Sequence, residues 1–349
     1  MQSHFQVYPD RIARDTGVLR ISTVDTHTAG EPLRVILSGV PLPKGKDILE
    51  RRRVAVGEWD RFRRLLMYEP RGHVDMYGAL IVPPVSPTAV FGVLFMHNEG
   101  YSTGCGHATI ALAKLAVELG WVSAQEPVTR IDIDAPSGLL KAYARVSGGK
   151  VVSSGFENVA SFAPMLGRSL HVTEIGDVTF DLGYGGAFYA YVDADKLGLT
   201  LEPNNAREIA AVGMSIKKAV AASFPVEHPD SRDLSYLYGT IFYCKPQRSD
   251  AHSRHVCVFA DGAIDRSPTG TGVSGRVAII RAQGLLNIGQ PVLFESITGE
   301  CFQGRVLRDC RIHDQSAVIP EVEGTAFITG RHEFILEQDD PLTDGFLLR

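Results

Sequence analysis

A single cysteine lies at the start of a predicted helix in the stretch EGYSTGCGHATIALAKLAVELG, residues 99–120. A free cysteine is most often a buried structural residue, but the Ser, Thr, Gly and His around Cys105 expose backbone rather than form a core. Unpaired N–H groups and partial positive charge at a helix N-terminus lower the pKa of a nearby thiol. The pattern therefore predicts a reactive thiol, accessible as thiolate at neutral pH.

Two histidines near this cysteine could take part in its chemistry. His107 could act as a base for Cys105, or it could bind a ligand through its backbone N–H. A side chain two residues on need not point at the sulfur, so we favour the backbone role. His97-Asn98-Glu99 matches half of a zinc deaminase motif, but the P-C-x-x-C half is missing, which disfavours a metal site.

A second polar loop, DRSPT at 265–269, precedes another predicted helix. It could be an ordinary turn with a serine or threonine as N-cap. It could instead bind a ligand, with Asp265 taking an ammonium group and the amides of Gly270 and Thr271 taking a carboxylate. The loop thus offers a second set of candidate site residues.

Residues 270–275 also spell the G-x-G-x-x-G of dinucleotide-binding sites, and Glu295 follows at about the expected spacing. In that motif the first glycine follows a strand almost directly, whereas DGAIDRSPT intervenes here. An NAD-dependent enzyme is therefore a disfavoured alternative.

Most of the chain reads as short β-branched strands separated by Gly, Pro and Asp. Strands are expected at 18–23, 33–37, 79–84, 89–96, 130–135, 150–159, 177–182, 188–193, 240–245, 255–260, 291–296, 317–320 and 333–338. Helices are expected at 47–67, 107–119, 205–219 and 272–283. At 349 residues the chain exceeds one typical core, so two domains are expected, with a linker near 160–168. The arginines at 51–53 and 61–64 are expected on a solvated helix face.

The regions around the two polar loops align with each other. CGH at 105–107 aligns with TGT at 269–271, and each opens an apolar periodic segment that ends at a glycine, Gly120 and Gly284. Glycine is the usual residue just past a helix C-terminus. The alignment predicts a pseudo-twofold architecture in which two helix starts face each other across a cleft.

Composition excludes some classes of protein. A net charge of −5 gives no reason to expect nucleic acid or an anionic membrane as partner. The N-terminal MQSHFQVYPDRIARD lacks an apolar signal core, and no run of about 18 apolar residues occurs, so a cytoplasmic location is expected. The five cysteines include no C-x-x-C, which disfavours a disulfide framework and a structural zinc site.

Taken together, these motifs resemble those of the proline racemase family. The matching segments are DTHTAGEP (25–32), EPRGHVDMYG (69–78), HNEGYSTGCGH (97–107), DLGYGGAFYAYVD (181–193), DRSPTGTG (265–272) and DPLTDGF (340–346). The resemblance implies an α/β (α+β) fold like that of diaminopimelate epimerase. Two pseudo-symmetric domains would each wrap strands around a central helix, with the active site between them. We expect the domains at 1–164, with a strand at 335–349 returning to it, and at 165–334.

Racemases and epimerases of that family use two thiols, one on each face of the substrate Cα. This sequence keeps Cys105, but Thr269 stands where those members have the second cysteine. An aliphatic hydroxyl is a poor acid or base at neutral pH, so two-base racemisation should fail or be very slow. The Cys/Thr pair resembles the pair found in those family members that dehydrate trans-3-hydroxy-L-proline to 1-pyrroline-2-carboxylate. This hydro-lyase reaction needs only one base at Cα.

The family pattern assigns backbone amides of four residues to the substrate carboxylate: Gly106, His107, Gly270 and Thr271. It assigns the ring ammonium to Asp265, and we expect Thr269 to hydrogen-bond the leaving C3 hydroxyl or a water. The resemblance implies no metal, flavin or pyridoxal cofactor. It does imply a homodimer. The alternatives are a 4-hydroxyproline 2-epimerase or proline racemase that uses another acid, and an inert amino-acid-binding relative.

Overall fold

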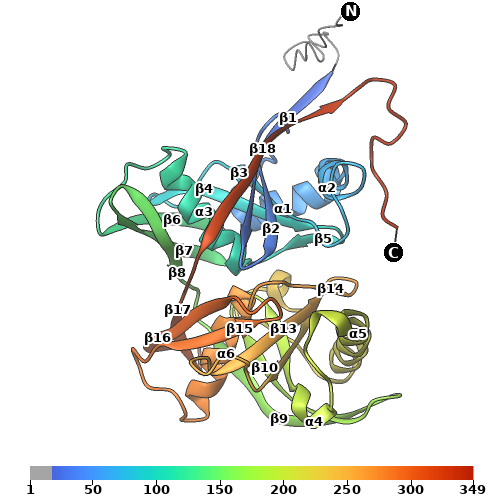
Figure 1. The fold of residues 1–349 in the computed structure, drawn as a ribbon, viewed down its shortest axis with the longest axis vertical. Helices are drawn as coiled ribbons and strands as arrows, with labels where there is room; N and C mark the ends of the chain where they lie inside the picture. The colour runs from blue at the N-terminus through green and yellow to red at the C-terminus, as the bar shows by residue number, and fades with distance from the viewer. Residues whose placement is uncertain (1–17, 349) are drawn as a thin grey trace, which may run out of the picture.

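The computed structural model of the protein describes residues 18–348 and has two lobes, one above the other in Figure 1. Residues 1–17, which include the segment expected to lack a signal core, lie outside the described residues. Within residues 18–348 the strands form one 18-stranded mixed sheet that runs through both lobes. No helix in this part of the chain is long and apolar enough to cross a membrane.

Each lobe is built from strands and a few helices. The first lobe contains β1 (Leu19–Thr28), β2 (Glu31–Ser38), α1 (Ile48–Val54), the π-helical turn η2 (Ala55–Trp59), α2 (Asp60–Met67), β3 (Tyr77–Val82), β4 (Ala89–His97), β5 (Gly100–Ser102), α3 (Gly106–Glu118), β6 (Val128–Ala135), β7 (Gly138–Ser147) and β8 (Lys150–Glu157). The second contains β9 (Phe162–Val172), β10 (Gly176–Tyr184), β11 (Phe188–Asp193), α4 (Ala194–Leu197), η3 (Pro203–Asn205), α5 (Ala206–Ser223), η4 (Arg232–Leu234), β12 (Leu237–Cys244), β13 (Ser253–Phe259), β14 (Ala263–Ile264), α6 (Gly270–Ala282), β15 (Val292–Ser296), β16 (Cys301–Ile312) and β17 (Gln315–Gly324). A last strand, β18 (Ala326–Leu336), returns to the first lobe (Figure 1).

The two lobes repeat one order of strand pairing. In the first, β1–β2 is antiparallel, β2–β3 parallel, β3–β4 antiparallel and β4–β6 parallel, and β6–β7–β8 continue antiparallel. In the second, β10–β11, β11–β12, β12–β13, β13–β15 and β15–β16–β17 repeat this order. In each lobe the central helix, α3 or α6, lies in the crossover between the second pair of parallel strands. The predicted pseudo-twofold fold is therefore confirmed.

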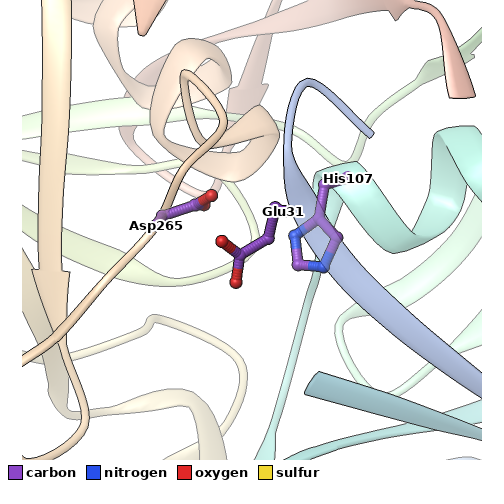
Figure 2. Close-up of side chains that lie close together, drawn as sticks. All are labelled: Glu31, His107 and Asp265. Atoms are coloured by element: carbon purple, nitrogen blue, oxygen red, sulfur yellow. The ribbon is translucent and has the colours of Figure 1, made fainter. Parts of the chain in front are cut away.

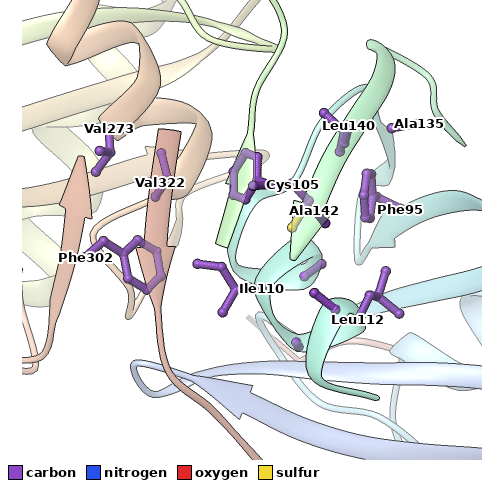
Figure 3. Packing of buried hydrophobic residues seen from close by; sticks show 14 of the residues in the cluster. Phe95, Cys105, Ile110, Leu112, Ala135, Leu140, Ala142, Val273, Phe302 and Val322 are labelled. Atoms are coloured by element: carbon purple, nitrogen blue, oxygen red, sulfur yellow. The ribbon is translucent and has the colours of Figure 1, made fainter. Parts of the chain in front are cut away.

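The central helices are buried on almost all sides. Each spans 13 residues, and in α3 small alanines alternate with leucine and isoleucine. A helix that is apolar all round belongs in a core. Figure 3 shows one apolar cluster that extends from Phe95 and Leu112 of the first lobe, past Cys105, to Phe302 and Val322 of the second. A shared core therefore fixes the two helix starts relative to each other.

The strand that closes the first lobe begins earlier than the sequence predicts. β18 pairs antiparallel with β1, from Leu19 opposite Leu336 to Thr28 opposite Ala326. The returning strand thus spans Ala326–Leu336 rather than 335–349. Its exposed Phe327 and the interruption at Gly330 hide the apolar alternation that marks a half-buried strand. The limits 1–164 and 165–334 stay a prediction.

Two other local expectations are wrong, although all four predicted helices occur. The predicted linker at 160–168 is mostly strand β9, which resembles a loop in sequence because it contains Pro and Gly and has few buried residues. The arginines of the first helix region do not all face solvent. Arg63 is buried and donates to the backbone carbonyl of His97 at 3.0 Å, and Arg52 donates to that of Tyr101. These guanidinium groups hold the β4–β5 turn just before the Cys105 loop, because a buried carbonyl needs a donor.

Candidate active site

The two central helices begin in direct contact with each other. Cys105 is the N-cap residue of α3 and Thr269 is the N-cap residue of α6. A Cβ atom on Gly106 would lie 2.3 Å from Cα of Gly270, so a side chain fits at neither glycine. The free N–H groups and the positive dipole ends of both helices therefore meet at one place. This place suits a carboxylate.

Cys105 is buried, and several groups surround its sulfur. The Sγ atom lies 3.4 Å from Nδ1 of His107, and the backbone N–H of Ala108 and the phenol of Tyr77 hydrogen-bond it. Burial raises the pKa of the Cys105 thiol well above its ordinary value, by more than these donors lower it. The expectation of a lowered pKa is therefore wrong, because desolvation outweighs the helix start.

The His107 imidazole contacts the sulfur, contrary to our preference for a role of the backbone alone. A ring N–H donates to the Pro32 carbonyl, which leaves the other ring nitrogen as an acceptor near the thiol. Burial lowers the pKa of His107, so the ring is neutral near neutral pH. The neutral imidazole can therefore accept a hydrogen bond from the Cys105 thiol.

The second helix start carries a carboxylate held by its own loop. Asp265 accepts from the backbone N–H of Ser267 at 2.7 Å and from the hydroxyl of Thr269 at 2.8 Å. Thr269 adopts φ 66°, a left-handed conformation that is costly for a β-branched residue. Such strain persists only where the surrounding structure imposes it, typically at functional sites. The Thr269 hydroxyl proton is directed at Asp265.

Glu31, at the start of β2, lies between Asp265 and His107 (Figure 2). One ligand atom from each of these three residues lies within 4.8 Å of the others. Oε2 of Glu31 accepts from the backbone N–H of Arg266 at 2.7 Å, while the buried Oε1 has no hydrogen-bond partner among residues 18–348. Burial, and then the charge of Asp265, raise the pKa of Glu31 well above its ordinary value. The three side chains of Glu31, His107 and Asp265 could together hold a metal ion or an organic ammonium ion.

All the predicted site residues line one cavity between the lobes: Cys105, Gly106, His107, Asp265, Thr269, Gly270 and Thr271. The rest of its wall is largely aromatic, from Tyr77, Tyr189, Tyr238 and Phe259, and the thiol of Cys257 also lines it. The cavity volume is about 20 Å³, which is room for about one water. The walls must therefore move apart to admit an amino acid.

Sequence reasoning missed several residues of this region, among them Glu31, Tyr77 and Cys257. Glu31 and Tyr77 stand in polar motifs that the sequence analysis singled out without assigning them a role. Cys257 gave no signal, because it lies within the apolar strand β13. Its thiol hydrogen-bonds Thr269.

The two disfavoured motifs have structural roles. Asn98 donates to the backbone carbonyls of Met67 and His73 and fixes the turn after β4. In the G-x-G-x-x-G run, a Cβ atom on Gly272 would lie 2.3 Å from Ile241, and one on Gly275 would lie 2.3 Å from Tyr191. These glycines let α6 pack against the sheet.

Repeated topology and two facing helix starts, set around a thiol and a carboxylate, define an α/β enzyme with the diaminopimelate epimerase fold. A sequence model described as proline racemase matches residues 23–347, and the chain belongs to that family. The resemblance found in the sequence is thereby confirmed.

Named relatives within the family differ in activity. A protein of Burkholderia cenocepacia named trans-3-hydroxy-L-proline dehydratase is 46% identical over 94% of this chain and 98% of its own length. A Burkholderia multivorans protein named 3-hydroxyproline 2-epimerase has the same identity and coverage. The structure of a hydroxyproline epimerase from Agrobacterium vitis with bound trans-4-hydroxy-L-proline superposes with a TM-score of 0.90 at 30% identity, covering 96% of each chain. Sequence identity alone therefore does not show which of these reactions this protein catalyses.

Proposed function

We propose that this protein dehydrates trans-3-hydroxy-L-proline to 1-pyrroline-2-carboxylate. The observation that carries the proposal is the unequal pair at the two helix starts, a thiol at Cys105 and a hydroxyl at Thr269 that donates to Asp265. Inverting a stereocentre needs a base on one face and an acid on the other, whereas elimination needs one base at Cα. A 46% identical relative bears the name of this reaction.

The substrate carboxylate binds between the two helix starts. Gly106, His107, Gly270 and Thr271, which form the first turns of the two helices, line the cavity, and their backbone N–H groups are the donors we assign to the carboxylate. Removal of the α-proton moves negative charge onto the carboxylate, so donors already in place stabilise the transition state more than the bound substrate.

The ring ammonium binds Asp265. The hydrogen bonds from Ser267 and Thr269 orient this carboxylate before the substrate arrives. Thr269 is then a positioning residue, which differs from our expectation that it bonds the leaving hydroxyl. Glu31 and His107 lie beside Asp265 and complete a cation-binding corner.

Cys105 removes the α-proton. The thiolate forms an S–H bond, the Cα–H electron pair becomes the Cα=C3 double bond, and the C3–O bond breaks. The hydroxyl leaves as water once it gains a proton. The resulting enamine tautomerises to 1-pyrroline-2-carboxylate, and the electron count closes without an oxidant or reductant.

Incubation of the purified protein with trans-3-hydroxy-L-proline, followed by detection of the cyclic imine with an aldehyde colour reagent, tests the proposal. We expect imine formation without inversion of L-proline or trans-4-hydroxy-L-proline. Inversion without imine contradicts the proposal, and binding without turnover identifies an inert amino-acid-binding relative.

A second candidate is an epimerase of the same family. Cys257 favours it, because this thiol lines the cavity and hydrogen-bonds Thr269, so it could supply a proton from the face opposite Cys105. Chiral chromatography in D₂O distinguishes the two functions. An epimerase gives inverted, α-deuterated amino acid, and Cys257→Ala abolishes it.

A further inference from the structure

The phenol of Tyr77 lies in the cavity next to the Cys105 sulfur, and the proposed function gives it no role. Tyr77 is the first residue of β3 in the first lobe and is buried. Its hydroxyl hydrogen-bonds the Cys105 sulfur, Oγ of Ser102 and the phenol of Tyr238. Its ring packs edge-on against His107, with ring centroids 4.8 Å apart. Tyr77 is therefore held rigidly at the reacting thiol.

The stereochemistry of the substrate fixes the face from which the hydroxyl leaves. In trans-3-hydroxy-L-proline the C3 hydroxyl and the carboxylate lie on opposite faces of the ring. The α-proton is also opposite the carboxylate, so the α-proton and the hydroxyl share one face. The base that takes this proton and the group that assists the hydroxyl must therefore stand on the same side of the ring.

The departing hydroxyl needs an acid on that side. Hydroxide is a poor leaving group, and proton donation to such a group accelerates a reaction by about 10²–10⁴-fold. Thr269 and Asp265 belong to the second lobe, and the Thr269 hydroxyl donates a hydrogen bond to the Asp265 carboxylate. Tyr77 comes from the lobe of Cys105 and touches its sulfur.

We propose, resting on the proposed function, that Tyr77 protonates the departing C3 hydroxyl and then regains a proton from the Cys105 thiol. Cys105 takes the α-proton to become S–H, the Tyr77 O–H gives its proton to the C3 oxygen, the C3–O bond breaks, and water and the enamine result. The S–H proton then passes along the Cys105–Tyr77 hydrogen bond to the phenolate. This transfer restores thiolate and phenol, so the cycle needs no proton from solvent.

The groups around Tyr77 can stabilise both its protonated phenol and its phenolate. Burial raises the pKa of Tyr77 well above its ordinary value, so the phenol carries its proton when the substrate binds. The hydroxyl of Ser102 can donate to the phenol oxygen, while the Tyr77 O–H is itself a donor toward the Cys105 sulfur and the phenol of Tyr238 and can turn to the C3 oxygen when the substrate binds. The Ser102 hydroxyl also stabilises the phenolate after the proton has left.

Tyr77→Phe, measured on two substrates, tests the proposal. The variant keeps the ring that packs on His107 and removes the proton donor. We expect dehydration of trans-3-hydroxy-L-proline to fall by about 100-fold or more. With trans-3-chloro-L-proline, whose chloride leaves without a proton, we expect a much smaller loss, since leaving-group protonation is no longer needed and only the hydrogen bond from Tyr77 to the Cys105 sulfur is missing.

The outcomes separate this proposal from the proposed function. Equal losses on both substrates would mean that Tyr77 acts only through the Cys105 thiolate or the fold and would overturn the proposal, as would full dehydration by Tyr77→Phe. If the unmutated protein does not dehydrate the hydroxy substrate, the proposed function itself fails. Tyr184→Phe is the matched control, because the buried Tyr184 hydroxyl has no hydrogen-bond partner among the described residues; it should keep full activity on both substrates.

Discussion

The starts of α3 and α6 have the same backbone frame but different side-chain chemistry. Each follows a short strand, each begins at a glycine, and the two glycines touch. Cys105 caps α3 in a relaxed extended conformation and faces His107, whereas Thr269 caps α6 in a strained one and faces Asp265. The repeat thus supplies a symmetric anion site, and the cap residues make its two sides unequal.

This division has a physical reason. A carboxylate accumulating charge between two helix dipoles benefits equally from both. Proton transfer at Cα is directional, and elimination uses one face alone. The first lobe can therefore hold the thiol and phenol while the second holds the ammonium-binding carboxylate.

Loss of the first-lobe thiol should have the largest effect. We expect Cys105→Ser to lower kcat/KM for imine formation by about 10³-fold or more, because a hydroxyl is a poor base near neutral pH. Cys310→Ser is the control, since this half-buried cysteine lies outside the cavity and the variant should keep full activity. An active Cys105→Ser variant would contradict the assignment of the base.

Separating the two helix starts should have the next largest effect. A methyl at position 270 would lie 2.6 Å from Cα of Gly106, where only backbone could give way. A shift of about 1 Å at a positioning group costs about 10²-fold, so we expect Gly270→Ala to lower kcat/KM by about that factor. Gly57→Ala, whose methyl meets nothing within 4 Å, is the control and should change kcat/KM little. A folded Gly270→Ala variant with unchanged kcat/KM would show that contact between the helix starts is unimportant.

Making the two sides chemically equal should redirect the reaction. We expect Thr269→Cys to lower dehydration by about tenfold, because a thiol is a weak donor to Asp265. It should also introduce inversion at Cα, seen as α-deuterated D-isomer by chiral chromatography in D₂O. Thr269→Ser keeps the hydroxyl and should dehydrate without inversion. Absence of inversion in the folded cysteine variant would mean that position 269 does not face Cα.

The parts of this site that could be predicted from the sequence are those encoded locally. Each helix start is a short segment in which glycine, a cap residue and apolar periodicity occur together, so both were found with their neighbours. Tyr77 reaches the cavity only through the pairing of β3 with β2 and β4, and Cys257 only through β13. Such long-range pairing leaves no mark near the residue itself.

The same limit explains the errors in the fold and the electrostatics. β9 contains a proline, a glycine and few buried positions, so its pairing with β10 cannot be recognised from its own residues. The raised pKa of Cys105 comes from burial, which depends on the whole surrounding core. Arg63 is buried because two backbone carbonyls of a distant turn need a donor.

The smallest expected effect is a pH-dependent change in stability at Glu31, which lies between His107 of the first lobe and Asp265 of the second. Burial raises the pKa of this carboxyl in the folded protein, whereas an unfolded glutamate titrates near about 4.3. Below that pH both states hold the proton. As the pH rises further, the unfolded state loses its proton first, so the stability contributed by neutral Glu31 is lost progressively up to the folded pKa.

Glu31→Gln removes this titration while keeping the size of the side chain. The Tm of the variant minus the Tm of the unmutated protein should therefore increase by a few degrees between about pH 4.5 and pH 8. Differential scanning calorimetry at several pH values measures this difference, in which the titrations of other groups cancel. Glu337→Gln, at an exposed position, is the matched control for loss of a carboxyl group. A constant difference for Glu31→Gln would mean that the Glu31 carboxyl ionises in the folded protein as readily as in the unfolded one, and would contradict the burial effect.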